Sequence, residues 1–333
     1  MPLYDPQALA AALPGDAPCG PDLEYDPAFL AMEQAGEGRP ETQYGDSIQP
    51  AQDPDWPTVM REGLALAART RDLRVATWLT RAGARLDGFP GAARGLRLTH
   101  ALLENHWNAV HPRLDESEGN DPTARVSALM PLAHPAAGLA DLRTATLTGR
   151  RNGLAVRQIE LASGAADPVG GETVPSQAGL QQGVSEALTE MPELASQMEA
   201  AHAAVAGISG LLEKHLEASQ TPDLGELRNL LQRVADSARM ATGAAGAESA
   251  AATPSGAASA ATRGIGAIAS REDAIRALGK ACEWIETNEP SHPAPLLIRR
   301  AQRLLSMDFL EIIKDIAPDG LSQIERLAGT ANT

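Results

Sequence analysis

Histidine is the residue type in this chain best suited to metal binding or proton transfer. Three of the seven histidines fall close together, His100, His106 and His111, with spacings of six and five residues. A pair of metal ligands on one helical face needs a spacing of three or four residues. The spacing therefore favours structural histidines over a metal site.

Other catalytic signatures fail on a required residue. An EF-hand loop starting at Asp115 needs a glycine where Asn120 stands and a glutamate where Val126 stands. Lys280 lacks the upstream glycine and the following hydroxyl of a phosphate-binding loop, and Ser209 lacks the spacing of a hydrolase elbow. We predict no catalytic, cofactor-binding or metal-binding residue and no enzyme. The enzymatic alternative requires Asp115, His106 and His111 to cluster around a metal-binding pocket.

The composition of the chain indicates its fold class and the partners that it disfavours. The 333 residues contain 28 Lys and Arg against 43 Asp and Glu, a formal charge of −15, which disfavours binding to nucleic acid or to an anionic membrane. Hydrophobic residues make up 43% but aromatic residues only 3%, so the core must be rich in Ala and Leu. Such a core favours helices, and we predict a predominantly all-α fold.

The chain shows no cue for export or membrane insertion. Its N-terminus lacks the basic segment of a signal peptide, and no apolar stretch approaches the length of a membrane span. Cys19 and Cys282 are far apart and suggest no disulfide framework. These features predict a cytoplasmic protein without direct membrane insertion.

Helix signals recur through the N-terminal half. Aspartates at 26, 55 and 72 precede apolar runs and predict helix N-caps. The sequence 88–91, Gly-Phe-Pro-Gly, predicts a break between two helices, and the three histidines fall on or beside the second. Alternating residues with an Asn-Gly turn also allow a small β-hairpin over 144–161.

The middle of the chain is acidic. Positions 158–227 hold eleven Asp and Glu residues against one basic residue, Lys214. A solvated helical face is the favoured interpretation, with a docking surface for a basic partner as the alternative. Low-complexity sequence within 242–269 predicts a flexible linker. The expected domains are a helical N-terminal domain 1–162, a linker 163–183, a helical hairpin 184–241, the linker 242–269 and a helical C-terminal domain 270–333.

The C-terminal domain has more apolar surface than a small core can cover. Residues 296–313 hold a dense run of Leu, Ile and Phe in two short helices, the first opened by Pro295. The surplus predicts subunit contact, with a compact monomeric bundle as the alternative. The candidate oligomer-interface residues are Arg299, Arg300, Phe309 and Leu310.

Two regions resemble one family. The N-terminal blocks are GPDLEYDPAF, QYGDSIQPAQDPDW, RTRDLRVATWLTRA, HWNAVHPRLDESEGNDPTARVSALMPLA and LRTATLTGR; the C-terminal blocks are EPSHPAPLLIRRAQRL, MDFLEII and APDGLSQIE. The first set resembles the ImpA-type N-terminal domain of TssA proteins of bacterial type VI secretion. The second resembles the C-terminal segment of short-type TssA proteins.

The resemblance implies a non-enzymatic, ring-forming homo-oligomer, associated with the baseplate at the inner face of the bacterial inner membrane. It would help to initiate tail tube and sheath assembly together with other baseplate, tube and sheath proteins. The chain ends without the extended C-terminal region of the long, sheath-capping forms, which favours the baseplate role. The alternative is a monomeric helical adaptor that recruits a single partner protein through a groove lined by Trp78 and Trp107.

Overall fold

Helices dominate the residues that the structure describes, which confirms the prediction of a predominantly all-α fold. The computed structural model describes residues 4–39, 42–44, 47–243, 275, 278–280, 282, 285 and 293–305. Two compact units are distinguished, Met1–Thr253 (unit 1) and Pro254–Thr333 (unit 2), and each is described by itself.

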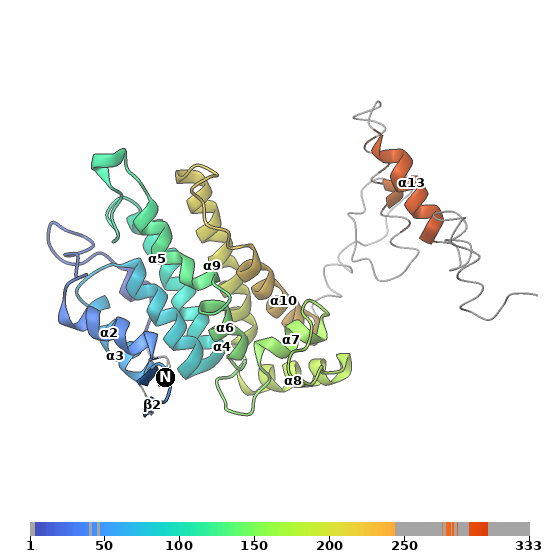
Figure 1. Ribbon diagram of the computed structural model, residues 1–333, viewed down its shortest axis with the longest axis horizontal. Helices are drawn as coiled ribbons and strands as arrows, with labels where there is room; N and C mark the ends of the chain where they lie inside the picture. The colour runs from blue at the N-terminus through green and yellow to red at the C-terminus, as the bar shows by residue number, and fades with distance from the viewer. Residues whose placement is uncertain are drawn as a thin grey trace, which may run out of the picture. The chain divides into compact units, whose positions relative to one another are not determined.

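Unit 1 is a succession of packed helices with one short pair of antiparallel strands (Figure 1). Its elements are α1 (Pro6–Ala10), α2 (Pro27–Glu37), β1 (Thr42–Tyr44), β2 (Ser47–Gln49), α3 (Trp56–Ala67), α4 (Leu73–His106), the 3-10 helix η1 (Glu116–Glu118), α5 (Thr123–Ala133), α6 (Gly138–Thr144), α7 (Val156–Ala162), α8 (Gln177–Glu190), α9 (Leu194–His215) and α10 (Gly225–Ala241). The strands pair in the register Thr42↔Gln49, Gln43↔Ile48, Tyr44↔Ser47.

Helix α4 is the centre of unit 1, because α1, α3, α5, α6 and α9 all pack against it. It bends at Gly88, whose φ of 66° and ψ of −150° are not helical. Beyond the bend, the Phe89 backbone N–H donates to the Thr146 carbonyl at 2.9 Å. The break predicted over 88–91 is therefore confirmed, and only glycine adopts this conformation without strain.

The predicted N-caps are confirmed at three helices. Asp26, Asp55 and Asp72 accept hydrogen bonds from the backbone amides of Ala28, Thr58 and Arg74, at 2.9, 3.2 and 2.8 Å. Each carboxylate satisfies an amide that has no partner within its helix. The caps fix where α2, α3 and α4 begin.

One hydrophobic cluster runs from α1 to α10. Helix α9 packs on both α4 and α10 and buries a stripe along its length: Leu194, Met198, Ala201, Val205, Ile208 and Leu212. The segments 1–162 and 184–241 thus share a core, while their separation into domains stays a prediction. Helix α8 begins at Gln177, inside the segment that the sequence assigned to a linker.

The β-hairpin allowed over 144–161 is not formed. A single antiparallel bridge joins Thr146 to Ala155, and α7 begins at Val156. The Gln158 side chain accepts a hydrogen bond from the Ala155 backbone amide at 2.9 Å and so supports the first turn of α7. Helical spacing of the buried Val156 and Ile159 therefore overrides the strand-like alternation.

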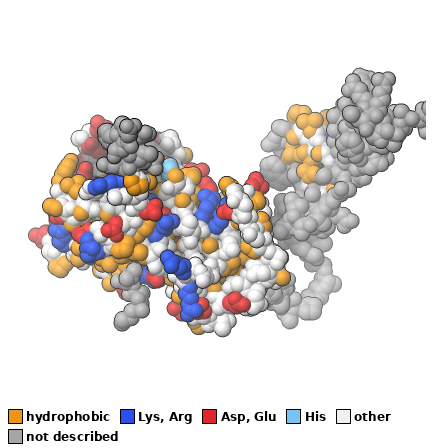
Figure 2. Space-filling model, turned by 60° about the horizontal axis from the view of Figure 1, so that its bottom comes forward, with side chains coloured by type: hydrophobic (Ala, Val, Ile, Leu, Met, Phe, Trp, Pro, Cys, Tyr) orange, Lys and Arg blue, Asp and Glu red, His pale blue; other side chains and the backbone are white. Residues whose placement is uncertain are grey.

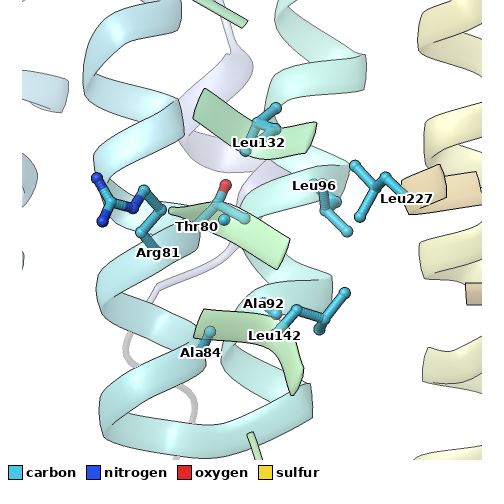
Figure 3. A pocket seen from close by; sticks show the side chains of 9 residues that line it. Thr80, Arg81, Ala84, Ala92, Leu96, Leu132, Leu142 and Leu227 are labelled. Carbon is cyan, nitrogen blue, oxygen red and sulfur yellow. The ribbon is translucent and has the colours of Figure 1, made fainter. Parts of the chain in front are cut away.

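The interior of unit 1 is closely packed. A cavity of about 10 Å³ lies where both halves of α4 meet α5, α6 and α10. Figure 3 shows Leu96, Leu132, Leu142 and Leu227 around it, while the Arg81 guanidinium points away. Such a volume is about that of one water position, so the cavity is a packing defect and not a ligand site.

The described part of unit 2 centres on α13 (Ala294–Leu305). Pro295 is buried, and its carbonyl lies 3.6 Å from the Cys282 thiol. The Gln302 side chain donates to the Ile275 carbonyl at 2.8 Å. One side of α13 therefore packs against the helical residues between 275 and 285.

Candidate functional site

The histidines of α4 and the following loop hold the N-terminal segment in place. His106 Nε2 lies 2.8 Å from the Ala10 carbonyl, and His111 Nε2 lies 3.1 Å from the Gly20 carbonyl. His100 lies against Gly207 of α9. These contacts give each of the three histidines a place in the packing of unit 1.

Asp115 is also engaged in local structure. Its carboxylate accepts hydrogen bonds from the Ser117 amide and hydroxyl at 2.9 and 2.6 Å, and these bonds lower its pKa. The three residues of the enzymatic alternative therefore serve three separate contacts and do not converge on a pocket. Across the part of the chain that the structure describes, no group of three potential ligands could hold a metal ion.

Trp78 and Trp107 do not share a groove. Trp78 packs against Gly36 of α2, with the Arg81 guanidinium 4.7 Å from its ring. Trp107 stacks on His215 with ring centroids 4.3 Å apart. The two rings fill separate clusters, so the groove expected for a monomeric adaptor is not formed by them.

A buried arginine, which sequence reasoning missed, organises the end of α4. Arg125 of α5 is fully buried and donates to the carbonyls of Trp107, Val110 and Pro112 at 2.6–3.0 Å. Burial lowers the pKa of its guanidinium to about 10. The Trp107 carbonyl lies at the C-cap of α4, where negative charge accumulates, and the Val110 and Pro112 carbonyls belong to the loop that follows. No local pattern identifies this role, because Arg125 occupies an ordinary helical position in sequence.

Arginines from flanking segments neutralise much of the acidic middle segment. Glu160 is buried and binds Arg143 and Arg157 at 2.9 Å, and Arg143 also binds Glu226 at 2.7 Å. Burial opposes ionisation of Glu160, but the hydrogen bonds from both arginines outweigh it and lower its pKa. These two carboxylates therefore already have basic partners within the chain, and the alternative of a docking surface for a basic partner stays a prediction for the other acidic residues.

A basic hollow lies at the bend of α4. It has a volume of about 360 Å³ and is lined by residues 84, 85 and 88 of α4 together with residues 144–146 and 149–151, including Arg150 and Arg151. Figure 2 shows that basic side chains gather on one face of unit 1; Lys214 is the single lysine of this unit, so these are almost all arginines. The hollow is the largest of the described cavities in which charged groups converge.

The predicted interface residues fall partly within the described chain. Arg299 and Arg300 are exposed on α13, whereas Phe309 and Leu310 lie outside the described residues. Leu296 and Leu297, which the sequence did not single out as interface residues, are 75% and 69% exposed. Figure 2 shows hydrophobic side chains gathered on the described part of unit 2. The apolar surplus predicted here is thus visible on α13.

No helix among the described residues combines the length and the apolar character needed to cross a membrane.

Comparison with known proteins identifies the family. Residues 10–134 match the family model for the N-terminal region of ImpA, type VI secretion system. The chain is 37% identical to the type VI secretion system component TssA1 of Pseudomonas aeruginosa, over 98% of this chain and 99% of that protein. Among solved structures, the TssA N-terminal domain from Burkholderia cenocepacia matches 73% of this chain and 95% of its own, with 23% identity and a TM-score of 0.50, and so supports the fold. Since the match to TssA1 is 37% identical and spans nearly the whole of both chains, this protein belongs to the TssA family of type VI secretion system components.

Proposed function

We propose that this chain is a non-enzymatic assembly component that forms a ring of identical subunits through residues 270–333. The ring associates with the baseplate at the inner face of the bacterial inner membrane and helps to initiate growth of the tail tube and sheath. Unit 1 docks other components of the secretion machine. The match to TssA1 over nearly the full length supports the role in secretion.

The observation that carries the ring is the exposed apolar face of α13. Leu296 and Leu297 are adjacent, and both are more than two-thirds exposed in the single chain. Burying a leucine side chain contributes about 1.5–3 kcal/mol, and closed symmetry repeats that gain at every subunit contact. Association between copies of α13 would therefore remove from water the apolar surface that unit 2 leaves exposed.

A ring would also explain how weak docking contacts become effective. Each subunit contributes one copy of unit 1, so a partner array meets several identical binding sites at once. Multivalent display raises the effective concentration without requiring a strong single contact. This gives unit 1 a docking role that needs no catalytic residue.

The mass of the full-length protein in solution tests the ring. Multi-angle light scattering should report a closed oligomer, and Leu296→Glu with Leu297→Glu should reduce the mass toward that of a monomer. Leu30→Glu with Met130→Glu is the matched control, because Leu30 and Met130 are 53% and 49% exposed on unit 1 and the pair carries the same change in charge. A monomeric wild-type chain at micromolar concentration would contradict the ring and favour the single-partner adaptor.

A further inference from the structure

The basic hollow of unit 1 is built from two distant parts of the chain. Arg85 precedes the bend of α4, and the opposite wall is the loop that ends in Arg150 and Arg151. Most of this wall belongs to the stretch LRTATLTGR, one of the blocks on which the family resemblance rests. Within this stretch, Arg143 binds Glu160 and Glu226, and the Thr146 carbonyl accepts from the Phe89 amide.

Backbone geometry fixes the shape of the hollow. Gly88 and Gly149 have φ values of 66° and 75°, and a Cβ added at Gly88 would lie 2.7 Å from Gly149 Cα. The two glycines therefore allow the bend of α4 and the loop to touch through their backbones. The side chains of the wall project from a closed, rigid base, which holds a binding geometry better than a mobile loop.

Some of the arginines that line the hollow have acidic partners in the described part of the chain, and one does not. Arg150 pairs with Glu190 of α8, and Arg85 donates to the Thr144 hydroxyl at 3.0 Å with the Asp141 carboxylate 3.9 Å away. Asp141 itself is bound by Arg81 at 2.8 Å. Within the described residues, Arg151 has no ion-pair partner. The hollow therefore keeps positive charge available in a chain whose formal charge is −15.

We infer that this hollow binds acidic side chains of a partner protein, with the Arg85 and Arg151 guanidinium groups pairing with the incoming carboxylates. Guanidinium groups form bidentate hydrogen bonds with carboxylates, and a cleft lined by one sign of charge attracts ligands of the opposite sign. The volume of about 360 Å³ suits one or two side chains. A nucleic acid is disfavoured, because its binding needs an extended basic surface that this acidic chain lacks. The inference rests on the proposed docking role of unit 1.

Fluorescence anisotropy with the full chain tests the inference. The probe is a short fluorescein-labelled peptide of glutamate residues, and the reference is the same peptide made of glutamine. The glutamate peptide should bind more tightly, and Arg151→Glu should weaken it about tenfold, since a charge-assisted hydrogen bond is lost and replaced by repulsion. Added salt should weaken binding further, as expected for exposed charges.

Arg113→Glu is the matched control. Arg113 is exposed and follows the end of α4 that is remote from the bend, and the helix between the bend and that end is about 27 Å long. It carries the same change in net charge as Arg151→Glu and should leave binding unchanged. Equal weakening by both variants, or no preference for glutamate over glutamine, would overturn the inference.

Two further measurements distinguish an acidic protein partner from a nucleic acid, and the site from the ring. A labelled single-stranded oligonucleotide that binds more tightly than the glutamate peptide, and that Arg151→Glu weakens, would replace the acidic partner by a nucleic acid and overturn the inference. Light scattering on the same samples separates this site from the ring. If the chain is monomeric and binds the peptide, the acidic-partner site is supported and the ring is contradicted. If the chain is oligomeric and does not bind the peptide, the ring is supported and the site is contradicted.

Discussion

Unit 1 and helix α13 differ in how far they bury side chains of the same residue types. The leucines of α9 and α10 are buried in one continuous core, whereas Leu296 and Leu297 of α13 are largely exposed. Several arginines of unit 1, among them Arg81, Arg125 and Arg143, bind carboxylates, carbonyls or aromatic rings within the same unit. Unit 1 therefore buries these side chains within one chain, while α13 exposes apolar surface that we propose another copy covers. Changes in unit 1 should thus affect unfolding, and changes in α13 should affect association.

The largest loss of stability is expected from Arg125→Leu. It leaves three buried carbonyls, those of Trp107, Val110 and Pro112, without their donor. Buried acceptors without partners are costly, and we expect the free energy of unfolding to fall by about 3–5 kcal/mol. Urea denaturation measures it, and Arg113→Leu on the exposed surface should change it by no more than about 0.5 kcal/mol. Similar losses for both variants would show that the end of α4 does not depend on this cation.

The bend of α4 should be the next most sensitive feature. Gly88→Ala introduces a Cβ 2.4 Å from the Thr146 carbonyl and strains a backbone with positive φ, at a cost of about 2–3 kcal/mol. Gly164→Ala shares the positive φ but meets no atom within 4 Å, so its cost should be about 1 kcal/mol. Thermal unfolding followed by circular dichroism compares the two. Equal shifts of the melting temperature in the two variants would mean that the contact between the bend and the loop contributes no stability.

Glu160→Gln tests whether the paired charges of the middle segment stabilise unit 1. The variant weakens bonds to Arg143 and Arg157, and we expect a loss of about 2 kcal/mol at neutral pH. Glu226→Gln is the control, since its carboxylate is 54% exposed and surface pairs contribute about 0–1 kcal/mol. A loss as large for Glu226→Gln as for Glu160→Gln would contradict the importance of burial.

The same ion pairs predict a dependence on pH. Hydrogen bonds from Arg157 lower the pKa of Glu172 to about 2, and the pKa of Glu160 is also below its ordinary value. A lowered pKa in the folded state means that the unfolded state binds protons more readily. The stabilisation is therefore present above the ordinary glutamate pKa of 4.5 and is lost as pH falls toward 2. Urea titrations across this range should show a weaker pH dependence in Glu160→Gln than in the wild type; an unchanged slope would contradict it.

The smallest effect on unfolding is expected from Arg299→Glu with Arg300→Glu. Both side chains are exposed on α13, so the unfolding of unit 1 should change by no more than about 0.5 kcal/mol. If these residues contact a neighbouring subunit, the oligomer should instead dissociate, which light scattering would detect. An unchanged oligomer mass would exclude Arg299 and Arg300 from the interface. A loss of stability in unit 1 would contradict the assignment of association to α13 and of folding stability to unit 1.

Local signals in the sequence predicted much of the fold. The caps at Asp26, Asp55 and Asp72 depend on contacts with amides two or three residues away, so their pattern is readable in sequence. The hairpin over 144–161 was wrongly allowed because alternation and helical spacing coexist there, and packing decided between them. Arg125 and the basic hollow depend on segments brought together only by the fold. For the interface, the sequence predicted surplus apolar surface and the residues Arg299, Arg300, Phe309 and Leu310, and this choice stays a prediction.

The two cysteines give each unit an internal reporter. Cys19 is buried in unit 1 and Cys282 in unit 2, with 1% and 2% of their surface exposed. Burial also raises the pKa of the Cys19 thiol, so alkylation there must wait for local opening of the chain. Mass spectrometry of peptides after timed alkylation would therefore record how often each unit opens, in the intact protein and without any added label site.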